Sequence, residues 1–299
     1  MLSKRATIIK SILRVSASAA PYSRSIIPQM RRRFDRLYSI ALPSHRHKVQ
    51  LQTIAGIRTV VAIPPHVTHR TIIYIHGGGF IMGSSRAYRQ HIKRLARLCH
   101  AHVYSIDYSL APESPYPIAL DEIQKIWETL VTNRQCDPLA TTIMGDSAGG
   151  NLVLASLLRF RDKGLPLPAC AALLSPSLDM TLSGASFSDP ATRDPILSTG
   201  KIKLFVKSYS GAHPKQDPLL SPIFATLTGL PPLLVHVGTD ELLFSDSQTI
   251  IKNAQRDGVD ANLYVGEGMW HDWHLSAAYV PEARRAMEDI AQFITSHTA

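Results

Sequence analysis

GDSAGG at residues 145–150 has the pattern Gly-x-Ser-x-Gly. The run ATTIM at residues 140–144 precedes it and predicts a short buried strand. The run NLVLASLL at residues 151–158 follows it and predicts a helix. A tight turn from strand to helix needs the flanking glycines, because a Cβ would clash there. Such a turn exposes a serine hydroxyl at the helix N-terminus, so this context favours Ser147 as a nucleophile over an incidental serine in a glycine-rich turn.

A second glycine-rich loop is HGGGF at residues 76–80, directly after the apolar run TIIYI at residues 71–75. Consecutive glycines let the backbone approach a ligand closely with its N–H groups exposed, which is what an oxyanion hole requires. A phosphate-binding loop would need a following Lys-Ser/Thr pair or the pattern G-x-G-x-x-G, and neither is present here. We therefore expect this loop to stabilise an oxyanion.

These and other motifs resemble the hormone-sensitive-lipase-like branch of the α/β-hydrolases, also called bacterial esterase family IV. The resemblance covers residues 45–299 and departs at Ser109, where the family often has arginine. The motifs that carry it are HGGGF at 76–80, DYSLAPE at 107–113, Tyr116-Pro117 with Asp121, GDSAGG at 145–150, GTDELL at 238–243 and GMWH at 268–271. It implies an α/β-hydrolase fold with a helical cap, and oxyanion donors at Gly78, Gly79 and Ala148, with Gly77 as an alternative donor.

The partners of the serine follow from chemistry and chain order. Serine needs a neutral histidine as base and a carboxylate that orients this histidine. In α/β-hydrolases the order along the chain is serine, acid, histidine, with both partners on loops after strands. Asp240 follows the apolar run LLVHV at residues 233–237, and His271 follows the run ANLYV at residues 261–265. We therefore predict a triad of Ser147, Asp240 and His271.

Several neighbouring residues compete for these roles. His274 lies three residues after His271 and is the main alternative base, whereas His236 lies inside a predicted strand. Glu241 and Asp246 lie close to Asp240, and we interpret both as favourable charges near a helix N-terminus. Asp146 precedes the nucleophile directly, so we expect it to have a structural hydrogen-bonding role.

The order of predicted elements indicates one α/β domain over residues 1–299, with a mostly parallel sheet and helices on both faces. Residues 177–222 interrupt this order and are predicted to be an inserted cap segment with one helix near 200–209. The predicted strands are 58–63, 71–75, 102–107, 140–144, 170–175, 233–237 and 261–265. The predicted helices of the domain are 86–99, 117–133, 149–163, 243–257 and 282–297.

The positive charge lies at the N-terminal end. The chain has 32 Lys and Arg against 23 Asp and Glu, a formal net charge of +9, and eleven of the basic residues but only one acid lie within residues 1–50. Residues 1–45 therefore form a basic segment, in which an amphipathic helix is predicted over 6–16. Its apolar face comprises Ile8, Ile9, Ile12, Leu13 and Val15, and Lys10 and Arg14 lie opposite.

Three roles for this basic segment remain open at the level of sequence. The first is a pair of cap helices whose basic sides face water. The second is a peripheral contact with a membrane or lipid surface, because basic amphipathic helices bind anionic interfaces. Nucleic-acid binding is disfavoured, since no nucleic-acid-binding motif accompanies the charge. Lys10 and Arg14 interrupt the apolar run that a secretory signal would need, so we expect a cytoplasmic protein, with an organellar transit peptide as the alternative that the Arg-rich, acid-poor composition also fits.

The predicted function is that of a serine carboxylesterase that hydrolyses short- to medium-chain esters of small molecules. Alternatives are a lipase acting on longer chains, another acyl hydrolase or transacylase, and, least favoured, a binding protein that lacks catalysis. The triad mechanism requires no cofactor and no metal. Three scattered cysteines, Cys99, Cys136 and Cys170, favour free thiols over a disulfide framework.

Overall fold

The protein folds around an eight-stranded sheet with the order β1-β2-β4-β3-β5-β6-β7-β8. The computed structural model describes residues 2–16, 22–40, 48–66 and 68–298. The strands are β1 (Val49–Ile54), β2 (Ile57–Ala62), β3 (Thr71–Ile75), β4 (His102–Ile106), β5 (Thr141–Asp146), β6 (Cys170–Leu174), β7 (Leu233–Gly238) and β8 (Ala261–Gly266). The α-helices are α1 (Lys4–Ser16), α2 (Ile27–Ile40), α3 (Arg89–Leu98), α4 (Ile118–Thr132), α5 (Ala148–Asp162), α6 (Thr199–Ser210), α7 (Phe244–Arg256) and α8 (Pro281–His297).

The sheet is parallel from β4 to β8, and only its first strands run antiparallel. β2 pairs antiparallel with both β1 and β4, whereas each pair from β3–β4 to β7–β8 is parallel. Because parallel strands end at the same edge, the loops that follow β3, β5, β7 and β8 all lie at one edge of the sheet. These are the loops that carry the predicted site residues.

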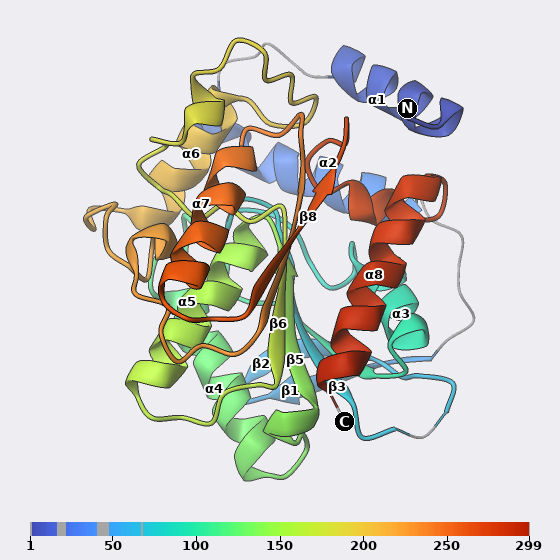
Figure 1. Ribbon diagram of the computed structural model, residues 1–299, viewed down its shortest axis with the longest axis vertical. Coiled ribbons are helices and arrows are strands. Elements are labelled where there is room, and N and C mark those ends of the chain that lie inside the picture. Colours follow the sequence, from blue (N-terminus) through green and yellow to red (C-terminus); the bar gives the residue numbers. More distant parts are fainter. Residues whose placement is uncertain (1, 17–21, 41–47, 67, 299) are drawn as a thin grey trace.

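Helices cover both faces of the sheet, as the alternation of elements predicted. α3 and α8 lie on one face, and α4, α5 and α7 lie on the other (Figure 1). The strands between them are buried on both sides; every residue of β3, β5 and β6 is buried. One apolar cluster includes Trp127 and Phe160, and the cluster on the opposite face includes Trp273 and Met287.

Sequence patterns located the buried strands well and missed β1. β1 is the outermost strand of the sheet, and most of its residues are partly or fully exposed. Its sequence VQLQTI therefore lacks the continuous apolar run that marks the inner strands. The predicted helix near 200–209 is observed as α6, inside the segment 177–222.

A helix whose apolar face lies against the protein is observed only in part, because Ile9 and Leu13 of α1 pack against the core whereas other residues of that face do not. Ile8 and Ile12 were expected on the buried face of α1, yet they are 59% and 62% exposed. Lys10 was expected to face water, yet its side chain is only 12% exposed and its Nζ lies 2.6 Å from Asp240. The ion pair and the packing of Ala6, which is fully buried, therefore determine which side of α1 faces the protein. Val15 belongs to the same predicted face, but its side chain lies outside the described part.

Hydrogen bonds and ion pairs connect the basic N-terminal helices to the loops beside the predicted site. Lys10 Nζ also donates to the Gly268 carbonyl at 2.8 Å, in the loop that leads to His271. On α2, Arg31 donates to the Ile81 carbonyl at 2.6 Å and forms an ion pair with Glu113. The two helices form the N-terminal cap near the edge where β8 ends (Figure 1). The predicted end of this segment, residue 45, lies outside the described residues.

No helix in the described ranges is long and apolar enough to span a membrane. The three cysteines are free, and all three are buried.

The buried His91 provides a test of the packing on the α3 face of the sheet. Its ring lies 5.2 Å from that of Tyr74, and burial, with a smaller effect of Arg94, lowers its pKa to about 3. The folded protein thus excludes a proton that the unfolded chain binds below pH 6.5, so stability falls as the pH drops from 6.5 towards 3.

We predict that His91→Gln removes part of this pH dependence. The unfolding free energy of the native protein should fall more steeply below pH 6.5 than that of the variant, by up to about 1.4 kcal/mol per pH unit. Urea unfolding at several pH values between 7.5 and 5 measures the two slopes. Equal slopes would show that His91 is protonated without cost in the folded state.

Candidate active site

Ser147 lies at a strained turn between β5 and α5. Its φ is 52°, a conformation that a serine adopts only where the surroundings enforce it. Its backbone N–H donates to the Leu174 carbonyl at 2.7 Å. A Cβ at Gly145 or at Gly149 would collide with the Ile75 carbonyl, so both glycines are required for β5 and α5 to approach β3 this closely. The turn places the serine hydroxyl at the N-terminus of α5, as the sequence predicted.

The structure brings Ser147 and His271 together although 124 residues separate them. His271 Nε2 lies 2.9 Å from Ser147 Oγ, within hydrogen-bond distance. His271 is only 3% exposed and lies in the loop after β8. Both residues were predicted for these roles, and their geometry is that of a nucleophile and its base.

The carboxylate that orients His271 belongs to Glu241, and the prediction of Asp240 for this position is wrong. Glu241 Oε2 lies 2.9 Å from His271 Nδ1. Its other oxygen accepts hydrogen bonds from the Gly238 backbone N–H at 2.6 Å and from Ser175 Oγ at 2.8 Å. Glu241 is completely buried, so these donors both fix its orientation and compensate for the loss of water.

Asp240 points away from the histidine. Its backbone N–H donates to the Met269 carbonyl, and its carboxylate pairs with Lys10 and Arg14 of α1. Consecutive residues after β7 project in different directions, and Glu241 also has the longer side chain. Glu241 was interpreted from sequence as a charge at a helix N-terminus, but α7 begins only at Phe244.

The other candidates have structural partners. His274 Nε2 lies 3.3 Å from His236 Nδ1, and His236 Nε2 lies 3.0 Å from Asp289. Asp246 is buried in the first turn of α7 and accepts from the backbone N–H of Leu178. None of these contacts involves Ser147, so His274 does not take the place of His271.

Asp146 fixes the glycine loop, which agrees with the expected structural role. Its carboxylate accepts hydrogen bonds from Tyr74 Oη and Tyr88 Oη, each at 2.6 Å, and from the Gly77 backbone N–H at 3.0 Å. Because the Gly77 N–H already donates to Asp146, it is not available to donate a hydrogen bond to the oxyanion. The alternative assignment of Gly77 as an oxyanion donor is therefore wrong.

Gly79 and Ala148 remain well placed as donors. Both line a small cavity together with Ser147. Gly78 has a φ of 112° and Gly79 a φ of 62°, and a Cβ at Gly78 would collide with the Met82 carbonyl. Ala148 begins α5, where backbone N–H groups of the first turn have no partner within the helix.

The cavity beside Ser147 is narrow, about 20 Å³ in volume. Its walls are mostly apolar, with Leu197, Ile202 and Phe205 contributed by the segment that contains α6. The Phe205 ring packs so closely on Gly79 that a Cβ at this glycine would collide with it. α6 therefore limits the space next to Ser147.

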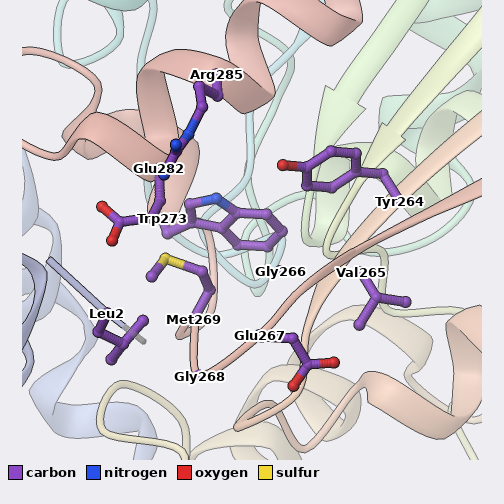
Figure 2. Close-up of a pocket in the computed structure, with 10 residues that line it drawn as sticks. All are labelled: Leu2, Tyr264, Val265, Gly266, Glu267, Gly268, Met269, Trp273, Glu282 and Arg285. Atoms are coloured by element: carbon purple, nitrogen blue, oxygen red, sulfur yellow. The ribbon is translucent and has the colours of Figure 1, made fainter.

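A larger cavity of about 430 Å³ lies elsewhere and contains none of the triad side chains. Figure 2 shows Leu2, Met269, Trp273 and Tyr264 around it, and the carboxylate of Glu282 belongs to the same wall. We assign the active site to the smaller cavity, because only that one contains Ser147.

Two carboxylates set the charge of the histidine. Burial alone would lower the pKa of His271, but Asp272 and Glu241 outweigh this effect and raise the pKa to about 9. Asp272 Oδ2 lies 3.1 Å from His271 Nε2, on the side of the ring that faces Ser147. Sequence reasoning did not single out Asp272; its position directly after His271 was the only available signal.

Comparisons with known proteins identify the family of this chain. The family described as alpha/beta hydrolase fold matches residues 72–275, which is more than half of the chain. The chain belongs to the α/β-hydrolase family. Within it, the protein is an esterase of the hormone-sensitive-lipase type, as its solved relatives show.

Three relatives of this esterase are informative. An acetyl-hydrolase from Streptomyces hygroscopicus is 34% identical over 235 residues, which cover 79% of this chain and 78% of the relative. A crystal structure of an esterase from the bacterial hormone-sensitive lipase family superposes with a TM-score of 0.94 at 32% identity, covering 100% of both chains. EstE5, soaked with p-nitrophenyl butyrate, has a TM-score of 0.92 at 35% identity and coverage of 99% of each chain.

The assignment of Glu241 predicts different consequences for two adjacent carboxyl groups. Glu241→Gln should lower kcat by ~10³–10⁴, because the amide no longer fixes the tautomer or stabilises the charged imidazole. Asp240→Asn should change kcat by less than about tenfold, because a partly exposed ion pair contributes little. Steady-state kinetics with p-nitrophenyl acetate measure both. A larger loss in Asp240→Asn than in Glu241→Gln would restore Asp240 as the acid.

Proposed function

We propose that this esterase hydrolyses esters of small acyl groups through an acyl-enzyme on Ser147. Ser147 Oγ attacks the ester carbonyl while its proton passes to His271 Nε2, 2.9 Å away. The Glu241 carboxylate accepts a hydrogen bond from the Nδ1–H of His271 and stabilises the imidazolium that forms. The oxyanion is stabilised by the backbone N–H groups of Gly79 and Ala148, with Gly78 next to them.

The first half of the reaction ends when His271 gives its proton to the leaving alkoxide, so that an alcohol departs and the acyl group stays on Ser147 Oγ. In the second half, water attacks the acyl carbon while one of its protons passes to His271. His271 then returns this proton to Ser147 Oγ as the C–Oγ bond breaks and the carboxylic acid leaves. The observation that carries this proposal is the hydrogen-bonded chain from Ser147 through His271 to Glu241.

The size of the cavity beside Ser147 supports a short acyl chain. A cavity of about 20 Å³ holds little more than a single small group, so an acetyl methyl fits, while longer chains require Phe205 or Leu197 to move. The Streptomyces relative is named an acetyl-hydrolase, and EstE5 was soaked with a butyrate ester. The name of the first relative and the ester soaked into the second agree with a preference for acetyl to butyryl esters.

We also propose that the segment 177–222 acts as a cap over the site, because its helix α6 supplies Phe205 to the wall of the cavity beside Ser147.

We predict that activity on p-nitrophenyl esters peaks between acetyl and butyryl and that Phe205→Ala shifts this preference. Removing the ring enlarges the cavity, so the ratio of kcat/KM for octanoyl over acetyl should rise on the order of tenfold. Ser147→Ala should lose esterase activity on every chain length and serves as the control. Full activity in Ser147→Ala would refute the nucleophile, and an unchanged ratio in Phe205→Ala would refute the acyl pocket.

We also infer a second role for the N-terminal cap, contact with an anionic lipid surface. Ile8 and Ile12 are exposed on α1, and the basic residues Lys4 and Arg5 are exposed beside them. Exposed apolar side chains next to positive charge are what such surfaces bind. Sedimentation with vesicles of anionic and of neutral lipids tests this. Binding to anionic vesicles should be lost in the double variant Ile8→Ser with Ile12→Ser; equal sedimentation of both proteins would contradict the role.

A further inference from the structure

His271 has a second carboxylate partner on its reactive nitrogen. Glu241 occupies Nδ1, as a triad acid must, whereas Asp272 Oδ2 lies 3.1 Å from Nε2. Ser147 Oγ lies 2.9 Å from this same Nε2. One nitrogen therefore faces both the nucleophile and a carboxyl group.

The contact between Asp272 and Nε2 requires a proton. With its Nδ1 proton on the side of Glu241, a neutral His271 presents a lone pair at Nε2. An ionised Asp272 oxygen also presents only lone pairs, so the two atoms would repel each other. The contact is attractive if His271 is protonated and donates to Asp272, or if Asp272 is protonated and donates to His271. In both forms the Nε2 lone pair is unavailable to the Ser147 proton.

The surroundings of Asp272 favour this shared proton. The side chain is only 11% exposed, and its Oδ1 has no hydrogen-bond partner among the described residues. A buried carboxylate without donors is costly unless a proton neutralises it. Burial accordingly raises the pKa of Asp272 well above its ordinary value, with His271 acting in the opposite direction. The backbone holds the residue in place, since its φ is 56° and its N–H donates to Ser175 Oγ at 3.2 Å.

We propose that Asp272 shares one proton with His271 and thereby competes with Ser147 for Nε2, so that the enzyme becomes active when this pair loses the proton to solvent. The proposal rests on the Ser147–His271 mechanism given above. After the proton leaves, the Ser147 proton moves to Nε2 as Oγ bonds to the ester carbon. The imidazolium then lies between two ionised carboxylates, which stabilise it. Asp272 thus contacts a reacting atom and sets the pH at which the base is available.

Other titratable groups face the pair from the elements packed around it. The carboxyl groups among them raise the proton affinity of the pair. They are Glu241 after β7, Asp194 before α6, Asp146 at the end of β5, His274 after β8, Tyr38 on α2, Tyr74 on β3 and Tyr88 before α3.

The test is the pH dependence of kcat/KM for phenyl acetate. Continuous titration of the acetic acid released measures the rate at each pH. The native enzyme should show an acid limb with its midpoint near the His271 pKa of about 9. Asp272→Asn removes the charge at nearly constant shape, and its midpoint should lie about 1–2 pH units lower. Asp240→Asn is the matched control, because its carboxyl group also lies near Glu241 but contacts Lys10 and not the histidine. Its midpoint should equal that of the native enzyme.

A second variant and a second readout keep the proposal testable. Asp272→Gly removes the whole carboxyl group and suits the φ of 56°, so it should shift the limb in the same direction. The ¹⁵N signal of His271 Nε2, identified by its loss in His271→Gln, reports the proton without any substrate. A lower titration midpoint in both Asp272 variants supports the proposal. Unchanged midpoints overturn it, even if Ser147→Ala has confirmed the esterase mechanism; persistent activity in Ser147→Ala would instead reject the mechanism on which it rests.

Discussion

The hydrogen bond between Ser147 and His271 is the contact on which the arrangement of this enzyme depends. The two residues follow β5 and β8, and β6 and β7 lie between these strands in the sheet. Because these strands are parallel, the loops after β5 and β8 lie at the same edge of the sheet, and the two side chains meet there at 2.9 Å. The strained backbone of Ser147 and the two glycines that flank it complete the approach. The buried core thus positions two side chains that no local interaction could bring together.

The N-terminal cap helices are bonded to loops at the same edge of the sheet. α1 and α2 are fastened by Lys10 and Arg31 to carbonyl groups in the loops that carry the histidine and the glycine motif. α6 places Phe205 against Gly79, next to the serine. A change in α1, α2 or α6 can therefore affect the width of the cavity beside Ser147 or the loop before His271 without touching the triad side chains. The location of the basic residues is explained in part by these internal contacts.

Sequence alone was sufficient for the parallel sheet and for the pairing of Ser147 with His271, because each depends on a local pattern: a buried strand, a glycine-flanked serine, and a histidine after the last strand. The acid was not accessible in this way. Asp240 and Glu241 are adjacent, and only the direction of each side chain after β7 decides which one meets His271. The apolar face of α1 was likewise predicted from periodicity, but Lys10 on the predicted polar side is drawn to the protein by an ion pair with a residue 230 positions later. Both differences from the prediction concern partners that are distant in sequence.

Formation of an acyl-enzyme on Ser147 can be observed by rapid quenching followed by mass spectrometry. The native enzyme is mixed with excess p-nitrophenyl acetate, quenched in acid within milliseconds to seconds, and digested. We expect one acetyl group per chain, on the peptide that contains Ser147, and accumulation of this species in step with a burst of p-nitrophenol. Turnover of the ester with no acetylated peptide, or with the acetyl group on another residue, would contradict it.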